Sequence, residues 1–219
     1  MGKKAVFVAG VALLALAAAV HAGGWAIVTV RDLPEYAVAG KALRLTFMVR
    51  QHGVEPRGGL TPTLTARSDA VTVTASAIET KNTGEYTATL ALPRPGHWTI
   101  TIDTVLFNDS TLPALTVIAP GGPTPSPLSP AALGERLFVA KGCIGCHVNR
   151  EVQARHLVDV GPDLTGKRFP DIYLNSLLAD PKATRAREAE PNEGEMPNLD
   201  LTNPEIAALT AFINRERPR

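Results

Sequence analysis

Cys143-Ile144-Gly145-Cys146-His147 is the most informative segment of this 219-residue chain. It holds both cysteines of the sequence, three positions apart, and a histidine follows directly. Two thiols at this spacing can each add to one vinyl group of the same porphyrin, while the adjacent imidazole faces the iron. The segment therefore predicts one covalently bound haem c, attached through Cys143 and Cys146, with His147 as an axial ligand of the iron.

Three other interpretations of the segment stay open. A dithiol redox motif would use the two cysteines without needing His147. A zinc site would need further ligands downstream, and the chain has no other cysteine. Two buried cysteines beside an incidental histidine would have only a structural role. Haem attachment is the interpretation that uses all three residues.

The residues around this segment show helical periodicity. Ser129 and Pro130 are typical of a helix start, and the helix is expected to continue to about Lys141. A second apolar helical face covers residues 170–179 and stops before Pro181. Thr202 and Glu205 have the spacing of a capping box, which predicts a last helix that carries Ile206, Leu209 and Ile213.

Residues 128–219 resemble class I cytochromes c beyond the haem motif. Gly134 and Phe138 on the first helix, with Leu209 and Phe212 on the last, are similar to the residues at which the family's terminal helices cross. The resemblance implies an all-α cytochrome c fold for this part of the chain.

The same resemblance implies two further site residues. Gly161-Pro162-Asp163-Leu164 is similar to the loop in which a proline carbonyl accepts the second N–H of the haem histidine, so Pro162 would orient His147. Met196, in Glu195-Met196-Pro197, is similar to the methionine that supplies the sixth iron ligand, with His156 as the alternative. Ligation by histidine and methionine leaves no vacant coordination position, which favours an electron carrier over an enzyme.

Residues 119–130 contain five prolines in twelve positions and are expected to form an extended linker. Before the linker, apolar and polar residues alternate in about seven short runs separated by turns. This pattern predicts an antiparallel, all-β, Ig-like sandwich over residues 23–118. The expected strands lie at 25–31, 43–49, 62–67, 71–73, 86–92, 98–102 and 115–117.

The predicted sandwich resembles small exported Ig-like domains of the YtkA-like or FixH-like kind. The resemblance is carried by 24–28, 51–53, 84–86 and 96–98. It implies an interaction module associated with respiratory oxidases rather than a catalytic site. A copper site formed by Met48, His52 and His97 is the competing hypothesis, because imidazole and thioether groups suit copper.

The N-terminus and the composition indicate where the protein works. Lys3 and Lys4 precede an apolar run and a small residue at Ala22, so residues 1–22 are expected to be a secretory signal peptide, with an uncleaved membrane anchor as the alternative. The chain is 45% hydrophobic and carries a net charge of +1, which argues against intrinsic disorder and against a nucleic-acid partner.

These observations predict a periplasmic or otherwise extracytoplasmic monohaem c-type cytochrome, carrying single electrons in a respiratory chain. Its expected partners are redox proteins, such as a membrane haem-copper oxidase or another respiratory complex. The alternatives are a haem sensor or haem enzyme that recognises substrate through the sandwich, and a copper-handling accessory protein of an oxidase.

Overall fold

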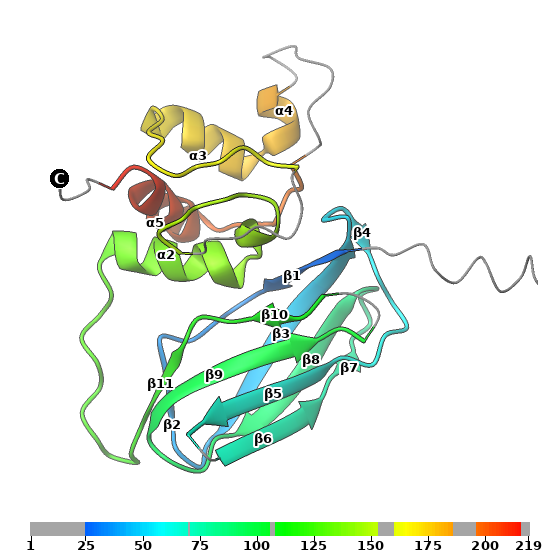
Figure 1. The fold of residues 1–219 in the computed structure, drawn as a ribbon, viewed down its shortest axis with the longest axis vertical. Coiled ribbons are helices and arrows are strands. Elements are labelled where there is room, and N and C mark those ends of the chain that lie inside the picture. Colours follow the sequence, from blue (N-terminus) through cyan, green and yellow to red (C-terminus); the bar gives the residue numbers. More distant parts are fainter. Residues whose placement is uncertain (1–24, 70, 106–107, 153–159, 186–195, 216–219) are drawn as a thin grey trace, which may run out of the picture.

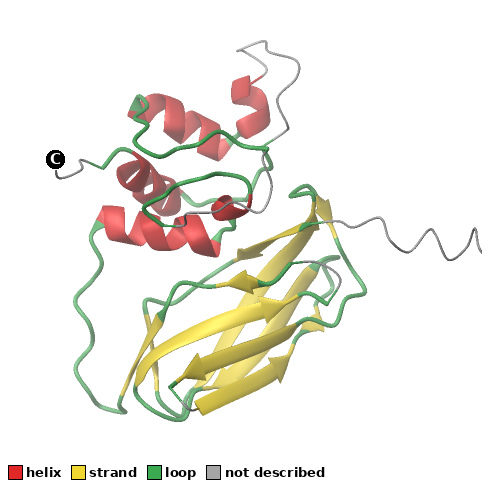
Figure 2. Ribbon diagram, in the orientation of Figure 1, coloured by secondary structure: helices red, strands yellow, loops and turns green. Residues whose placement is uncertain are grey.

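The computed structural model describes residues 25–69, 71–105, 108–152, 160–185 and 196–215. A strand-rich β part, residues 25–118, is followed by a C-terminal part, residues 128–215, that carries the helices (Figures 1 and 2). The chain between them runs along one side of the molecule without regular structure (Figure 1). The expected signal peptide, residues 1–22, lies outside the described residues. Within the described ranges, no helix is both long enough and apolar enough to cross a membrane.

The β part consists of two sheets. One has the order β1-β3-β8-β7, with β4 paired to β3, and the other has the order β2-β11-β9-β5-β6, with β10 paired to β9. Its strands are β1 (Ala26–Val30), β2 (Tyr36–Val38), β3 (Ala42–Gln51), β4 (Glu55–Pro56), β5 (Thr63–Ser68), β6 (Val71–Ser76), β7 (Ile78–Glu79), β8 (Glu85–Ala91), β9 (Gly96–Asp103), β10 (Ser110–Thr111) and β11 (Leu115–Ile118).

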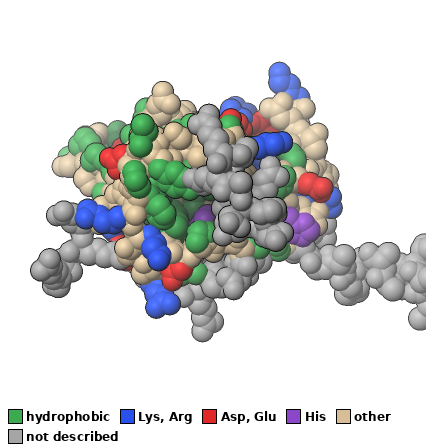
Figure 3. Space-filling model, turned by 90° about the horizontal axis from the view of Figure 1, so that it is seen from above, with side chains coloured by type: hydrophobic (Ala, Val, Ile, Leu, Met, Phe, Trp, Pro, Cys, Tyr) green, Lys and Arg blue, Asp and Glu red, His purple; other side chains and the backbone are tan. Residues whose placement is uncertain are grey.

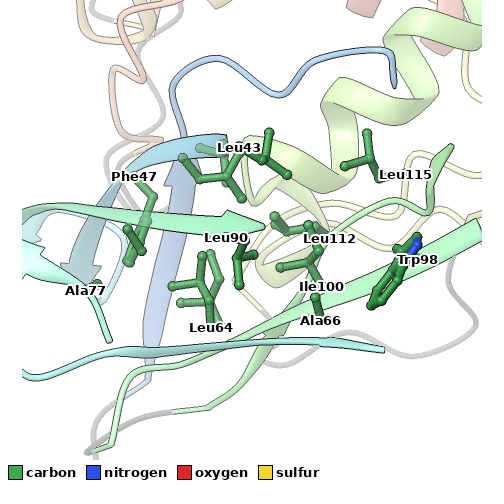
Figure 4. Packing of buried hydrophobic residues seen from close by; sticks show 14 of the residues in the cluster. Leu43, Phe47, Leu64, Ala66, Ala77, Leu90, Trp98, Ile100, Leu112 and Leu115 are labelled. Carbon is green, nitrogen blue, oxygen red and sulfur yellow. The ribbon is translucent and has the colours of Figure 1, made fainter. Parts of the chain in front are cut away.

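The core of the β part lies between the two sheets. Alternate residues point inward: Leu43, Leu45 and Phe47 of β3 are buried on one side, and Trp98 and Ile100 of β9 face them from the other sheet (Figure 4). In β3 and β9, the period of two in the sequence therefore corresponds to one buried face and one more exposed face of the strand.

Two details of the β part differ from an antiparallel Ig-like sandwich. β2 pairs with β11 in parallel, Tyr36 beside Thr116 and Val38 beside Ile118. Four strands of two or three residues also extend the sheets beyond the seven expected runs. The pairing of β2 with β11 joins segments about 80 positions apart, which a local alternation pattern cannot specify.

The C-terminal part contains α2 (Pro130–Ala140), the 3-10 turn η2 (Cys143–Gly145), α3 (Asp171–Ala179), α4 (Pro181–Arg185) and α5 (Asn203–Ile213). Ser129 caps α2 by accepting from the Ala132 N–H at 3.3 Å, and Pro130 occupies the first turn. The capping box of α5 is confirmed, because the Glu205 carboxylate accepts from the Thr202 N–H at 2.9 Å.

Helices α2 and α5 cross in close contact at Gly134. A Cβ atom at this position would lie 1.9 Å from the Ala208 carbonyl oxygen, so only glycine permits this approach of the two backbones. The rings of Phe138 and Phe212 pack beside the crossing, with their centroids 5.4 Å apart. This crossing forms one wall of the C-terminal core.

The predicted fold class is wrong, because the C-terminal part is not an all-α domain. Its helices have only 11, 9, 5 and 11 residues, and the described segments 146–152, 160–170 and 196–202 between them are loops and turns. The physical reason lies in the sequence. Proline has no N–H to donate, so helical hydrogen bonding is interrupted at Pro162, Pro170 and Pro197, and these segments form loops.

The two parts of the chain pack directly against each other. Strand β1 lies at the boundary, next to α2 (Figure 1), and all five of its residues are buried. Ala26, Val28 and Val30 belong to the core of the β part, whereas Ile27 faces the C-terminal part, where it lies against Gly142. The C-terminal part therefore covers one face of an edge strand.

Candidate haem site

The turn after α2 places both cysteines and His147 on one side of the C-terminal part. α2 ends at Ala140 with Lys141 as its C-cap, and Gly142 then adopts a left-handed conformation with φ of 80°. In the following turn, the N–H groups of Cys146 and His147 both donate to the Cys143 carbonyl oxygen, at 3.2 and 2.9 Å. The local backbone thus groups the three side chains that the sequence motif singles out.

Cys143 and His147 line a cavity of about 260 Å³ in the C-terminal part. Cys143, His147, Pro162 and Met196 contribute to its walls. The other wall residues are apolar or aromatic: Phe138, Leu164, Phe169, Tyr173, Leu174, Leu177, Leu178, Leu209 and Ile213. An apolar cavity with a few polar groups on its wall suits a large flat hydrophobic cofactor.

A second cavity, of about 270 Å³, lies between the two parts of the chain. Cys143, His147, Pro162 and Met196 line this cavity as well, so the two cavities adjoin. Cys146 lines only the second one. The view from above shows apolar side chains in the middle of the face, with charged side chains of both signs around them (Figure 3).

The Pro162 carbonyl fixes the orientation of the His147 ring. Nδ1 of His147 lies 3.1 Å from the Pro162 oxygen, and because a carbonyl can only accept, Nδ1 must carry the proton. The lone pair of the imidazole is then on Nε2, the state required of a metal-ligating histidine. Gly161 permits this arrangement, since a Cβ there would lie 2.7 Å from the His147 ring.

Both thiols are free in the structure and are poor candidates for redox chemistry. Burial raises the pKa of the Cys143 thiol to about 12, and the neighbouring Cys146 thiol adds to this shift. Burial also raises the pKa of Cys146. A redox dithiol needs a thiolate at neutral pH, so the elevated pKa values argue against that interpretation.

The other candidate residues do not form an alternative metal site. Met48 lines a separate cavity with Arg50 and Asp200, His52 lies in the cavity between the two parts, and His97 is exposed on β9 of the other sheet. Across the described ranges, no three His, Cys, Asp or Glu side chains gather closely enough to hold a metal ion. His156, the alternative sixth ligand, lies outside the described residues.

Sequence reasoning missed the contribution of the β part to this site. Trp25, Ile27 and His52 line the cavity between the two parts, opposite the cysteines. One signal was present in the sequence: Ala26-Ile27-Val28-Thr29-Val30 is apolar at four of five positions, as expected of a strand that is covered on both faces.

The residues present fit a covalently attached haem. Two cysteines and an oriented histidine lie on an apolar cavity, with a methionine on the same walls. This arrangement is the one that attachment of a c-type haem requires.

Comparison with known families agrees with this interpretation. Residues 131–215 match the family model of cytochrome c, which supports a class I cytochrome c domain with covalently bound haem c in this part of the chain. The chain therefore carries a haem-binding electron-transfer domain. The match does not include the β part, and its resemblance to YtkA-like or FixH-like domains is not confirmed. Comparison with curated proteins gives no match.

Solved structures that match the chain include two of the S-layer protein SbsC. Its domains 4 and 5 are 16% identical, with a TM-score of 0.33 over 44% of this chain and 54% of that chain. Its domains 1–6 are 17% identical, with a TM-score of 0.34 over 46% of this chain and 14% of that chain. Both TM-scores are low, and the likeness carries no conclusion about fold or function.

Proposed function

We propose that the protein is an exported monohaem c-type cytochrome that carries single electrons in a respiratory chain. The observation that supports this most strongly is that Cys143, Cys146, His147 and Met196 all line one cavity. A haem held there would supply an iron that takes up and releases one electron. The chain would work as a carrier rather than as an enzyme.

Each site residue has a defined task in this proposal. Cys143 and Cys146 tether the cofactor, and His147 presents Nε2 because the Pro162 carbonyl holds its Nδ1 proton. Met196 supplies a thioether from the loop at 196–202, which favours a higher reduction potential than nitrogen ligands alone. The leucine and aromatic side chains of the cavity exclude water, so less solvent has to reorganise when the iron gains or loses an electron.

The Met196→Ala variant tests the ligand assignment and the carrier function together. We expect a lower reduction potential and binding of carbon monoxide by the reduced variant, whereas the wild type should not bind carbon monoxide. Met48→Ala is the matched control, because Met48 lines a different cavity. An unchanged spectrum and potential in Met196→Ala would refute the ligand assignment. Rapid binding of carbon monoxide by the wild type would instead favour a sensor or a haem enzyme.

The partner and the compartment are part of the same proposal. An exported location follows from the expected signal peptide at 1–22, and membrane association would follow if that segment stays uncleaved. Purification of the tagged protein from membranes, with haem staining, tests both points. A respiratory complex in the purified material would support the proposal, and a purely cytoplasmic haem-stained protein would contradict it.

A further inference from the structure

The position of Cys146 connects the proposed haem site to the β part. Cys143 lines both cavities, whereas Cys146 lines only the cavity between the two parts of the chain. A group bonded to both sulfur atoms must therefore extend into that second cavity. Its outer side is formed by Trp25, His52 and Val54, all from the β part.

A tight turn fixes the position of His52. His52 and Gly53 both have positive φ values, 52° and 76°, and the Val54 N–H donates to the Gln51 carbonyl oxygen at 3.1 Å. These features are those of a type I′ turn, a well-defined hairpin connection. Because the turn sets the backbone, the direction of the His52 side chain is set as well.

Trp25 is held against this turn. The His52 N–H donates to the Trp25 carbonyl oxygen at 2.9 Å, and the two rings lie 5.7 Å apart at an interplanar angle of 58°. A Cβ atom at Gly53 would lie 3.7 Å from both Trp25 and Pro197, the residue after Met196. The turn that holds the two rings therefore lies beside the loop that carries the proposed sixth ligand.

Polar contacts hold the β part in place beside the cysteines. The buried Lys141 ammonium donates to the Arg31 carbonyl oxygen at 2.7 Å, and Thr29 Oγ1 donates to the Lys141 carbonyl oxygen at 3.3 Å. Arg136 donates to the carbonyl oxygens of Ala114 and Pro34, at 2.7 and 2.8 Å. These contacts fix the β part against the end of α2, two residues before Cys143.

We propose that Trp25 and His52 form the outer wall of the haem site on the side of the cysteines. The β part then shields this edge of the cofactor from water and from small reductants. Since water stabilises the more highly charged oxidised state, shielding raises the reduction potential. This inference rests on the proposed haem attachment at Cys143 and Cys146.

Substitution of each wall residue in the haem-loaded full chain tests the inference. We expect Trp25→Ala and His52→Asn to lower the midpoint potential and to give a severalfold faster reduction by ascorbate. Asn is chosen because it tolerates the positive φ of position 52. His97→Asn is the matched control, since it removes an exposed histidine from the other sheet. Trp25→Phe should restore most of the wild-type potential.

The outcomes separate this inference from the proposed function. If the variants keep the wild-type haem spectrum but show the potential and ascorbate rate of His97→Asn, the wall role is refuted and the carrier function is untouched. If the wild type carries no covalent haem, the proposed function itself fails. Should Trp25→Ala not fold by far-UV circular dichroism, His52→Asn decides the question alone, because the His52 side chain is exposed.

Discussion

Gly134→Ala is the substitution whose effect follows most directly from the structure. An alanine Cβ at this position would lie 1.9 Å from the Ala208 carbonyl oxygen, 2.5 Å from its carbon and 2.6 Å from Phe212 Cβ. Two of these three atoms belong to the backbone of α5, which cannot rotate away as a side chain can. Helices α2 and α5 would have to move apart by more than an ångström to reach the 3.4 Å of an ordinary contact.

Two opposing terms set the size of the effect. Overpacking of a well-packed core costs about 1–3 kcal/mol, and a clash between backbones belongs at the upper end. Alanine in place of glycine inside a helix contributes about 1 kcal/mol in the other direction. The free energy of unfolding should therefore fall by about 2 kcal/mol. With a urea dependence of about 2 kcal/mol per molar, the midpoint shifts down by about 1 M.

Urea titration of the haem-loaded protein, followed by haem absorbance and far-UV circular dichroism, measures this shift. Ala132→Gly is the matched control, because Ala132 is exposed on the same helix and should lose only the helix-propensity term of about 1 kcal/mol. If Gly134→Ala raises the urea midpoint, the gain in helix propensity is larger than the steric cost at the crossing. The contact between α2 and α5 then does not depend on glycine.

Two further substitutions probe buried polar groups. Tyr86→Phe removes a hydroxyl that donates to the Arg57 carbonyl oxygen at 2.7 Å and accepts from the Leu60 N–H at 3.0 Å, so urea unfolding should show a loss of about 1–2 kcal/mol with intact haem spectra. Lys141→Met breaks the 2.6 Å ion pair with Glu205 and should cost about 3 kcal/mol at pH 7, the lower end for a buried pair, because Glu205 keeps some exposure. Burial by itself would raise the pKa of Glu205, but the bond from Lys141 lowers it. The ion pair therefore stabilises the folded state above the ordinary pKa of the carboxyl. This stabilisation is lost as the pH falls through the lowered pKa. Wild-type stability should thus decline more steeply on acidification than that of Lys141→Met, and equal pH dependence would contradict this assignment.

Local signals in the sequence predicted much of the secondary structure, and they singled out side chains that the structure places on the walls of two adjoining cavities. Alternation of apolar residues marked most of the seven long strands, because a strand with one buried face must repeat every two residues. The capping box marked the start of α5. Cys143, Cys146 and His147 could be singled out as candidates because the spacing that haem attachment requires is local and does not depend on the rest of the fold.

Contacts between distant segments were not predictable in the same way. The parallel pairing of β2 with β11 depends on the path of the whole chain, and β2 itself has only three residues. Lys141 is 4% exposed, although a lysine in a sequence normally indicates a solvated position. Its burial is possible only because the folded chain brings two partners from distant segments to the ammonium group: the Arg31 carbonyl oxygen and the Glu205 carboxylate.

Strand β1 shows why the two parts of the chain act as one unit. An exposed edge strand would be expected to carry polar residues on its outer face, yet Ile27 is 3% exposed there and Thr29 is bonded to the Lys141 carbonyl. Gly142 completes the fit, because a Cβ at this position would lie 2.5 Å from Ile27 Cγ2. The residue directly before Cys143 is thus shaped by the β part. The packing of β1 therefore affects the backbone position of the cysteines that would hold the haem. A substitution that displaces β1 should change the spectrum of the haem as well as the stability of the protein.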